Sequence, residues 1–188
     1  YDMLTLLKKS VLWDLLEEYP DYRYFDNTNL TRTMSDVYKN TKRPFVIIID
    51  EWDCIFREYK NDKDAQEKYL DFLRDTLKDK AYIQLVYMTG ILPIKKYGTH
   101  SALNMFSEYS MANPRQLAEY VGFTEKEVKE LCDQYHMNLK ELKEWYDGYS
   151  FDGVESIYSP RSVIEAVLSG VCDSYWNQTE TFEALQVY

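Results

Sequence analysis

Apolar side chains recur every three or four positions along residues 1–19, a spacing typical of a helix with one buried face. A shorter helical pattern follows at residues 30–38, and a further amphipathic pattern covers residues 65–77. Between these patterns, residues 45–49 form an unbroken, β-branched apolar run, and residues 82–89 form another. Runs of this kind predict strands covered on both faces of a parallel sheet. The order strand, helix, strand therefore predicts a βαβ unit with a right-handed crossover.

The second half of the chain has a mainly helical pattern. A capping box at residues 124–127 predicts the start of one helix, and residues 138–147 predict a second helix that Gly148 ends in a left-handed conformation. Residues 149–158 predict a hairpin around Asp-Gly, and the Ser-Pro pair that opens residues 159–170 predicts a last helix.

The change in pattern falls near residue 112. Residues 105–111 predict one further short strand of the first sheet, and helices follow from residue 113. We therefore expect an α/β domain over residues 1–112 and a mostly helical subdomain over residues 113–188.

The charge of the chain limits its partners. Thirty-two acidic residues against 22 basic ones give a net charge of −10 over 188 residues. Such a surface repels a phosphate backbone, so we expect no direct nucleic-acid binding by this chain, and an anionic membrane is an equally poor match. No apolar run approaches the length of a membrane span, and no signal segment opens the sequence. Three widely spaced cysteines indicate reduced thiols, so we expect a cytoplasmic protein.

The strongest chemical signal is the segment Asp50-Glu51-Trp52-Asp53, which directly follows the first apolar strand. Apolar residues that lead into Asp-Glu form the Walker B pattern. In it, the Asp belongs to the Mg²⁺ shell at the carboxyl edge of the sheet, and the Glu orients or deprotonates the attacking water. Three carboxylates so close together repel one another, and a divalent cation would offset that repulsion. A buried strand followed by a solvated acidic loop is the alternative interpretation.

The end of the second strand adds a weaker signal. Thr89 lies there, followed by Gly90, and P-loop ATPases with an additional strand place a polar sensor of the γ-phosphate at this point. A threonine chosen for its β-propensity is the alternative.

A phosphate-binding loop is missing from the sequence. None of the six glycines is followed by Lys and then Ser or Thr, so there is no G-x-x-x-x-G-K-[ST] loop to cradle phosphates. We therefore expect either that this loop lies upstream of residue 1 or that the protein does not bind nucleotide.

Segments spread along nearly the whole chain resemble the bacterial AAA-ATPase-like family and occur in that family's order. The resemblance implies a partial P-loop ATPase-type parallel sheet with flanking helices, followed by a mostly helical lid subdomain. Family members carry an R-R-F-G-K-[ST] phosphate loop far upstream, and many carry a PD-D/E-x-K-type nuclease domain downstream. Neither occurs here, which implies the middle part of a larger protein. The matching segments are IIIDEWDCIFREYK (47–60), VYMTGILPIKKYGTHSALNMFSEYSM (86–111), LAEYVGFTEKEVKELC (117–132), LKEWYDGY (142–149), IYSPRSVIEAV (157–167) and YWNQTETFEAL (175–185).

The resemblance assigns roles to three residues of this sequence. Asp50 resembles the Mg²⁺-associated Walker B aspartate, Glu51 resembles the catalytic glutamate, and Thr89 resembles the sensor threonine. It implies Mg²⁺-dependent ATP binding and hydrolysis in the intact protein. We expect this chain alone to be inactive, because the missing loop supplies most contacts to the triphosphate.

Other positions are assigned more loosely. Asp53 belongs to the family's DE-aromatic-D signature, and Lys95 follows the sensor strand, so both are candidates for binding the nucleotide. Lys95 or its neighbour Lys96 could reach a phosphate, although a solvated lysine pair is the alternative. His100 and Ser159 replace a frequent Gln and a usual Asn of the family.

Two alternatives to an ATPase stay open. One is a non-catalytic protein-interaction module derived from an ATPase core, although the retained Asp50-Glu51 pair argues against it. The other is a metal-only hydrolase built from Asp50, Glu51 and Asp53, which no histidine motif supports. The aromatic run at residues 145–149 is either a stacking surface for a ligand or part of the core. A protein client or self-association is the further partner expected.

Overall fold

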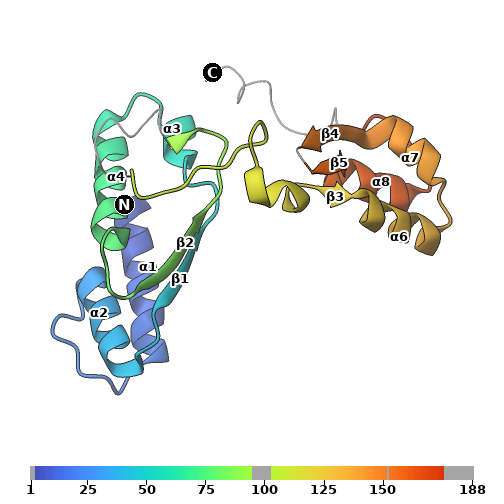
Figure 1. Cartoon of the computed structure of the whole chain (residues 1–188). Coiled ribbons are helices and arrows are strands. Elements are labelled where there is room, and N and C mark those ends of the chain that lie inside the picture. The colour runs from blue at the N-terminus through green and yellow to red at the C-terminus, as the bar shows by residue number, and fades with distance from the viewer. Residues whose placement is uncertain (1–2, 95–102, 152, 176–188) are drawn as a thin grey trace. The chain divides into compact units, whose positions relative to one another are not determined.

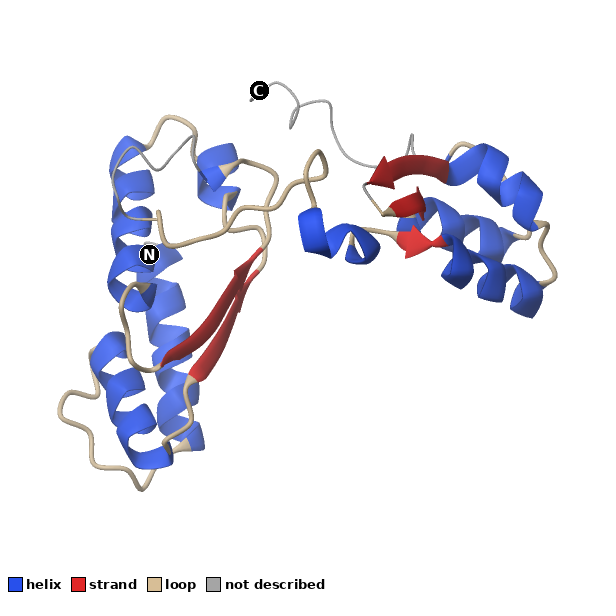
Figure 2. Cartoon of the chain, in the orientation of Figure 1, coloured by secondary structure: helices blue, strands red, loops and turns tan. Residues whose placement is uncertain are grey.

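The computed structural model describes residues 3–94, 103–151 and 153–175, and it divides into two compact units (Figures 1 and 2). Unit 1 is Tyr1–Phe106 and unit 2 is Ser107–Tyr188. Lys95, Lys96 and His100 lie outside the described residues.

The predicted helices and strands of unit 1 are confirmed. The structure adds a short helix that the sequence did not predict, because five residues are too few to show a helical period. The elements are α1 (Met3–Glu18), α2 (Leu30–Thr41), β1 (Phe45–Ile49), α3 (Cys54–Glu58, the added helix), α4 (Lys63–Leu77) and β2 (Ile83–Met88).

Local signals in the sequence set where these helices begin. The Asn29 side chain accepts a hydrogen bond from the backbone N–H of Arg32 and so caps α2. Asp62 caps α4 in the same way through the N–H of Ala65. Each cap satisfies a backbone donor that a helix start leaves unpaired.

Strands β1 and β2 pair in parallel, with Val46 opposite Leu85 and Ile49 opposite Met88. Helix α4 lies between them in the chain, as a parallel connection requires. One face of the pair packs on a core in which Leu30, Met34 and Tyr82 are buried. Side chains of α1, α2 and α4 complete this core, so these three helices cover that face of the sheet.

The other face of the strand pair is uncovered. Its four apolar side chains are each more than half exposed, and we call them the open face: Val46, Ile48, Leu85 and Tyr87. The prediction that both faces of these strands are covered is therefore wrong for the described residues. A continuous apolar run predicts that a strand can be buried on both sides, but it does not supply the second cover.

Unit 2 contains a three-stranded antiparallel sheet in the order β3-β5-β4 as well as helices. Its core is formed by buried side chains such as Val128, Leu142, Tyr158, Val163 and Ala166. The chain is thus a mixed α/β protein. Strands β4 and β5 form the predicted hairpin, and β3 is the strand that the sequence did not predict. Its elements are the 3₁₀ helix η1 (Arg115–Tyr120), β3 (Phe123–Thr124), α6 (Glu125–Tyr135), α7 (Leu139–Tyr146), β4 (Asp147–Phe151), β5 (Val154–Tyr158) and α8 (Pro160–Ser169).

The start signals predicted for unit 2 are confirmed. The side chain of Thr124 accepts from the N–H of Glu127, and the Glu127 carboxylate accepts from the N–H of Thr124, which completes the capping box. Pro160 occupies the first turn of α8, and Gly170 ends that helix in the left-handed conformation with φ 72°. Ser159 is at the N-cap position, but its side chain makes no capping hydrogen bond.

Two predictions for this region are wrong. Residues 105–111 form no strand, and only an isolated bridge joins Ser110 to Asn113, because alternation alone provides no neighbouring strand to pair with. Gly148 is not a left-handed helix stop. Asp147 ends α7 in an extended conformation and the chain enters β4 at once, so no reversal of the backbone is needed. In the predicted hairpin that follows, Gly153 has a positive φ of 82°.

Candidate functional site

Two polar residues meet where the parallel strands of unit 1 end. Asp50 follows β1 and Thr89 follows β2, and the Thr89 hydroxyl donates a hydrogen bond to Oδ1 of Asp50. The backbone continues the pairing beyond the strands, because the N–H of Thr89 donates to the carbonyl of Ile49 at 2.9 Å and the N–H of Trp52 donates to the carbonyl of Thr89 at 2.9 Å. Asp50 and Thr89, the two residues that the sequence analysis predicted at this edge, thus lie side by side at the carboxyl ends of the strands.

Glu51 turns the chain at this edge. Its backbone has a positive φ of 51°, a left-handed conformation that costs a non-glycine residue on the order of 1–3 kcal/mol. Its N–H donates to Oδ1 of Asp50 at 3.0 Å and lies 3.4 Å from the hydroxyl of Thr89. These hydrogen bonds stabilise the turn. The Glu51 side chain lies outside the core and is 63% exposed.

Asp53 is fully buried, unlike the other two carboxylates of the segment. Its Oδ2 accepts hydrogen bonds from the backbone N–H groups of Ile91 at 3.1 Å and Leu92 at 2.8 Å. The carboxylate therefore ties the start of α3 to the chain that leaves β2. A residue in this position has no free surface, so its burial gives no support to the expectation that Asp53 contacts a nucleotide.

Gly90 fits closely against this buried group. A Cβ atom at position 90 would lie 2.6 Å from Trp52 Cδ1 and 2.7 Å from Asp53 Oδ1, closer than real contacts allow. Trp52 is 3% exposed, and its ring centroid lies 5.6 Å from that of Phe56. The glycine after Thr89 is therefore required for close packing and not for a turn.

Arg57 is the residue of this site that the sequence analysis missed. It lies one helical turn after Asp53 on α3, and its Nε is 3.4 Å from Oδ2 of Asp53. Its Nη2 donates to Oε2 of Glu51 at 3.0 Å, and its side chain is only 19% exposed. Burial alone would lower the pKa of the Arg57 guanidinium, but the hydrogen bond to Glu51 and the charges of Asp53 and Glu51 outweigh burial and raise that pKa.

Arg57 changes the electrostatic argument made from the sequence. Its single positive charge pairs with two of the three clustered carboxylates, so it offsets part of their repulsion and leaves the cluster net negative. That a divalent cation would offset the remaining repulsion stays a prediction. The spacing of four residues between Asp53 and Arg57 could have revealed the pair, since residues at that distance are neighbours on a helix. Because α3 was not predicted, the spacing carried no meaning in the sequence alone.

Asp50 is the carboxylate that Arg57 leaves free. It is exposed, and the hydrogen bonds seen for it involve Oδ1, the oxygen shared with Thr89 and the N–H of Glu51. Mg²⁺ is usually held by one or two carboxylates together with substrate phosphates and water, so a single exposed Asp is compatible with this ion. Over residues 3–94, 103–151 and 153–175, no group of three or more His, Cys, Asp or Glu side chains is arranged to hold a metal. The metal-only hydrolase considered above therefore lacks a ligand set in the described part of the chain.

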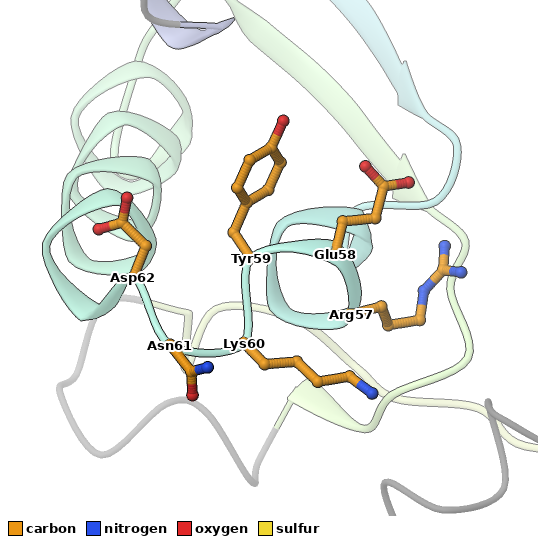
Figure 3. Close-up of a pocket in the computed structure, with 6 residues that line it drawn as sticks. All are labelled: Arg57, Glu58, Tyr59, Lys60, Asn61 and Asp62. Atoms are coloured by element: carbon orange, nitrogen blue, oxygen red, sulfur yellow. The ribbon is translucent and has the colours of Figure 1, made fainter.

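A surface depression of about 480 Å³ lies beside this cluster, between α3 and α4. Figure 3 shows the six consecutive residues that line it, Arg57 to Asp62. Neither Asp50 nor Thr89 lines it, so it does not lie over the strand ends. Arg57 belongs to both the depression and the buried ion pair.

The aromatic run of unit 2 has two parts with different surroundings. Tyr146 is buried, and its hydroxyl donates to the carbonyl of Asp173 and accepts from the N–H of the same residue. Burial raises the pKa of Tyr146 to about 12. Trp145 and Tyr149 are 42% and 48% exposed. The core interpretation thus describes Tyr146, while the other two rings remain accessible.

Together these observations define a mixed α/β protein with a polar cluster at the carboxyl edge of a parallel strand pair. Residues 8–100 match the model of the AAA-ATPase-like family, described as predicted AAA-ATPase, and this match is consistent with an AAA-ATPase-like family. The matched region contains Asp50, Glu51 and Thr89. No curated protein and no solved structure matched the chain. Among the described helices, none has the length and apolar character needed to cross a bilayer.

Proposed function

We propose that this chain is part of a P-loop-type ATPase in which Asp50, Glu51 and Thr89 act on a Mg²⁺-bound ATP. The observation that carries the proposal is the hydrogen-bonded meeting of these three residues at the carboxyl edge of β1 and β2. Ligands of open α/β folds bind at this edge, and the match of residues 8–100 to the AAA-ATPase-like family model supports the same chemistry.

Each residue has a distinct part in this proposal. Asp50 would hold the cation through its exposed carboxylate. Glu51 would accept the proton of the attacking water, and Thr89 would exchange its hydrogen bond to Asp50 for one to a phosphate oxygen. When bound, ATP would supply the γ-phosphoryl group, and Mg²⁺ would neutralise negative charge on the phosphates.

The rest of the nucleotide site must come from elsewhere in this proposal. The 188 residues contain no G-x-x-x-x-G-K-[ST] loop, so the phosphate cradle belongs to a segment outside them. Lys95 stays a proposed phosphate contact, and unit 2 is the proposed lid. We accordingly expect the isolated chain to bind ATP weakly. We also expect that a protein client, or a second copy of the chain, binds without nucleic acid.

The test is phosphate release from ATP by the intact protein that contains this chain, with and without Mg²⁺. Glu51→Gln is expected to lower kcat by about 10²- to 10⁴-fold, the usual contribution of a general base, with little change in KM. Glu58→Gln is the matched control, because Glu58 is an exposed carboxylate at the C-terminal end of α3. Unchanged turnover in Glu51→Gln would remove Glu51 from the mechanism.

A second function is favoured by one specific observation. The open face on β1 and β2 presents four apolar side chains, as a protein-binding module derived from an ATPase core would. This alternative predicts no Mg²⁺-dependent hydrolysis at all in the intact protein, so the same assay separates the two functions.

A further inference from the structure

Glu51 has little to hold its side chain apart from Arg57. It is 63% exposed, and the one hydrogen bond seen for its carboxylate is that from Arg57 Nη2 to Oε2. No described residue bonds to the other oxygen, Oε1. An exposed glutamate without such a partner samples several rotamers, and a general base needs a defined position relative to the water that it activates.

Arg57 is itself anchored by an ion pair with Asp53, in which its Nε makes no hydrogen bond. Its guanidinium lies against the fully buried carboxylate of Asp53, which two backbone N–H groups fix in place. Arg74 on α4 offers a contrast within the same unit. It also contacts two carboxylates, those of Asp71 and Asp75, but its side chain is 39% exposed against 19% for Arg57. An ion pair anchored in the interior restricts its partner more than a solvated pair does.

The contact between Arg57 and Glu51 leaves the base usable. Because Nη2 binds Oε2 alone, Oε1 is free to accept a proton. The buried carboxylate of Asp53 also binds the backbone of Ile91 and Leu92, just after the sensor Thr89. One buried ion pair thus connects the side chain of Glu51 with the chain segment that follows the sensor.

We propose that Arg57 is a positioning residue for Glu51: anchored by Asp53, it holds the Glu51 carboxylate through Oε2 and directs Oε1 toward the attacking water. This inference rests on the proposed ATPase function. It gives Asp53 an indirect role in catalysis in place of the nucleotide contact expected from the sequence.

The experiment compares substitutions of Arg57 in the intact protein by steady-state ATP hydrolysis. Arg57→Gln is expected to lower kcat about 10- to 100-fold with KM for ATP nearly unchanged, because misplacing a catalytic group costs about that much. Arg57→Lys keeps the positive charge beside Asp53 but lacks the fork that reaches both carboxylates, so it should restore part of kcat. Arg74→Ala, which removes solvated ion pairs, is the control and should leave kcat unchanged.

A double-mutant comparison separates positioning from a general structural effect. If Arg57 acts through Glu51, then adding Arg57→Gln to Glu51→Gln should cause no further loss of kcat. A further loss of the same size as in the single variant would show that Arg57 acts independently of Glu51 and would overturn the inference. Arg57→Lys serves the same comparison if Arg57→Gln fails to fold.

The outcomes distinguish this inference from the function on which it rests. A natural protein that hydrolyses no ATP overturns the proposed function, and the inference with it. A natural protein that is active while both Arg57 variants equal or exceed its kcat overturns the positioning role alone. A rise in KM without a fall in kcat also overturns it, because Arg57 would then serve binding.

Discussion

The cluster around Arg57 in unit 1 and the cluster around Lys143 in unit 2 both place a cation between two carboxylates, and they differ chiefly in burial. In unit 1, Arg57 joins Glu51 to Asp53, which is fully buried. In unit 2, Lys143 lies 3.0 Å from Glu125 and 3.9 Å from Asp147, and its side chain is 44% exposed. The pairing is alike, but water can replace each partner in unit 2 and cannot replace Asp53 in unit 1. We therefore expect substitutions to have large effects in the first cluster and small effects in the second.

The largest expected effect comes from removing the buried carboxylate. Asp53→Ala should lower the free energy of unfolding by about 3–5 kcal/mol, because it leaves Arg57 without its buried partner and two backbone N–H groups unsatisfied. Urea unfolding followed by tryptophan fluorescence and circular dichroism measures this loss. Glu125→Ala, which removes the exposed carboxylate paired with Lys143 in unit 2, should barely shift the transition. Similar losses in both variants would mean that burial does not separate the clusters.

A smaller effect is expected from the close packing around the same carboxylate. Gly90→Ala places a methyl group against Trp52 and Asp53, and relieving that contact should cost about 1–3 kcal/mol. Thermal unfolding measures the cost. Gly148→Ala is the control, because nothing lies within 4 Å of a Cβ at that position. Equal melting temperatures for the two variants would show that the chain around Gly90 shifts to accommodate the methyl group without loss of stability.

The smallest effect is expected in unit 2, at the capping box of α6. Hydrogen bonds from the backbone N–H and the hydroxyl of Thr124 lower the pKa of the Glu127 carboxyl. The stabilisation from Glu127 is therefore fully present above the unfolded pKa of about 4.3 and is lost as the pH falls through the lower folded value. Glu127→Gln should melt below the natural chain at pH 7 and approach it at pH 3. A gap that persists at pH 3 would contradict this origin.

Much of unit 1 was predictable because its helices and strands follow simple periods in the sequence. The apolar runs before Asp50 and Thr89 gave both strands, and parallel pairing then required the two polar residues to share an edge. Arg57 escaped prediction because its partners become neighbours only once α3 forms. The open face escaped prediction as well, since sequence periodicity indicates which side chains seek cover but not what covers them.

In unit 2, as in unit 1, features set by adjacent residues were predictable, and features set by distant segments of the chain were not. The capping box of α6 and the proline that opens α8 depend on a few adjacent residues, and both are confirmed. The strand predicted at residues 105–111 and the stop at Gly148 depended on what the neighbouring chain does, and both are wrong. Pairing partners and chain direction are set by distant segments, which a local pattern does not contain.

The two strands that Asp50 and Thr89 directly follow also carry the open face. Any segment that covers the open face therefore contacts the same two strands whose carboxyl ends position Asp50 and Thr89. Coverage of this surface gains roughly 25 cal/mol for each Å² of apolar area removed from water. Burial of the open face and alignment of the hydrogen bond between Asp50 and Thr89 thus depend on the same two strands, of five and six residues.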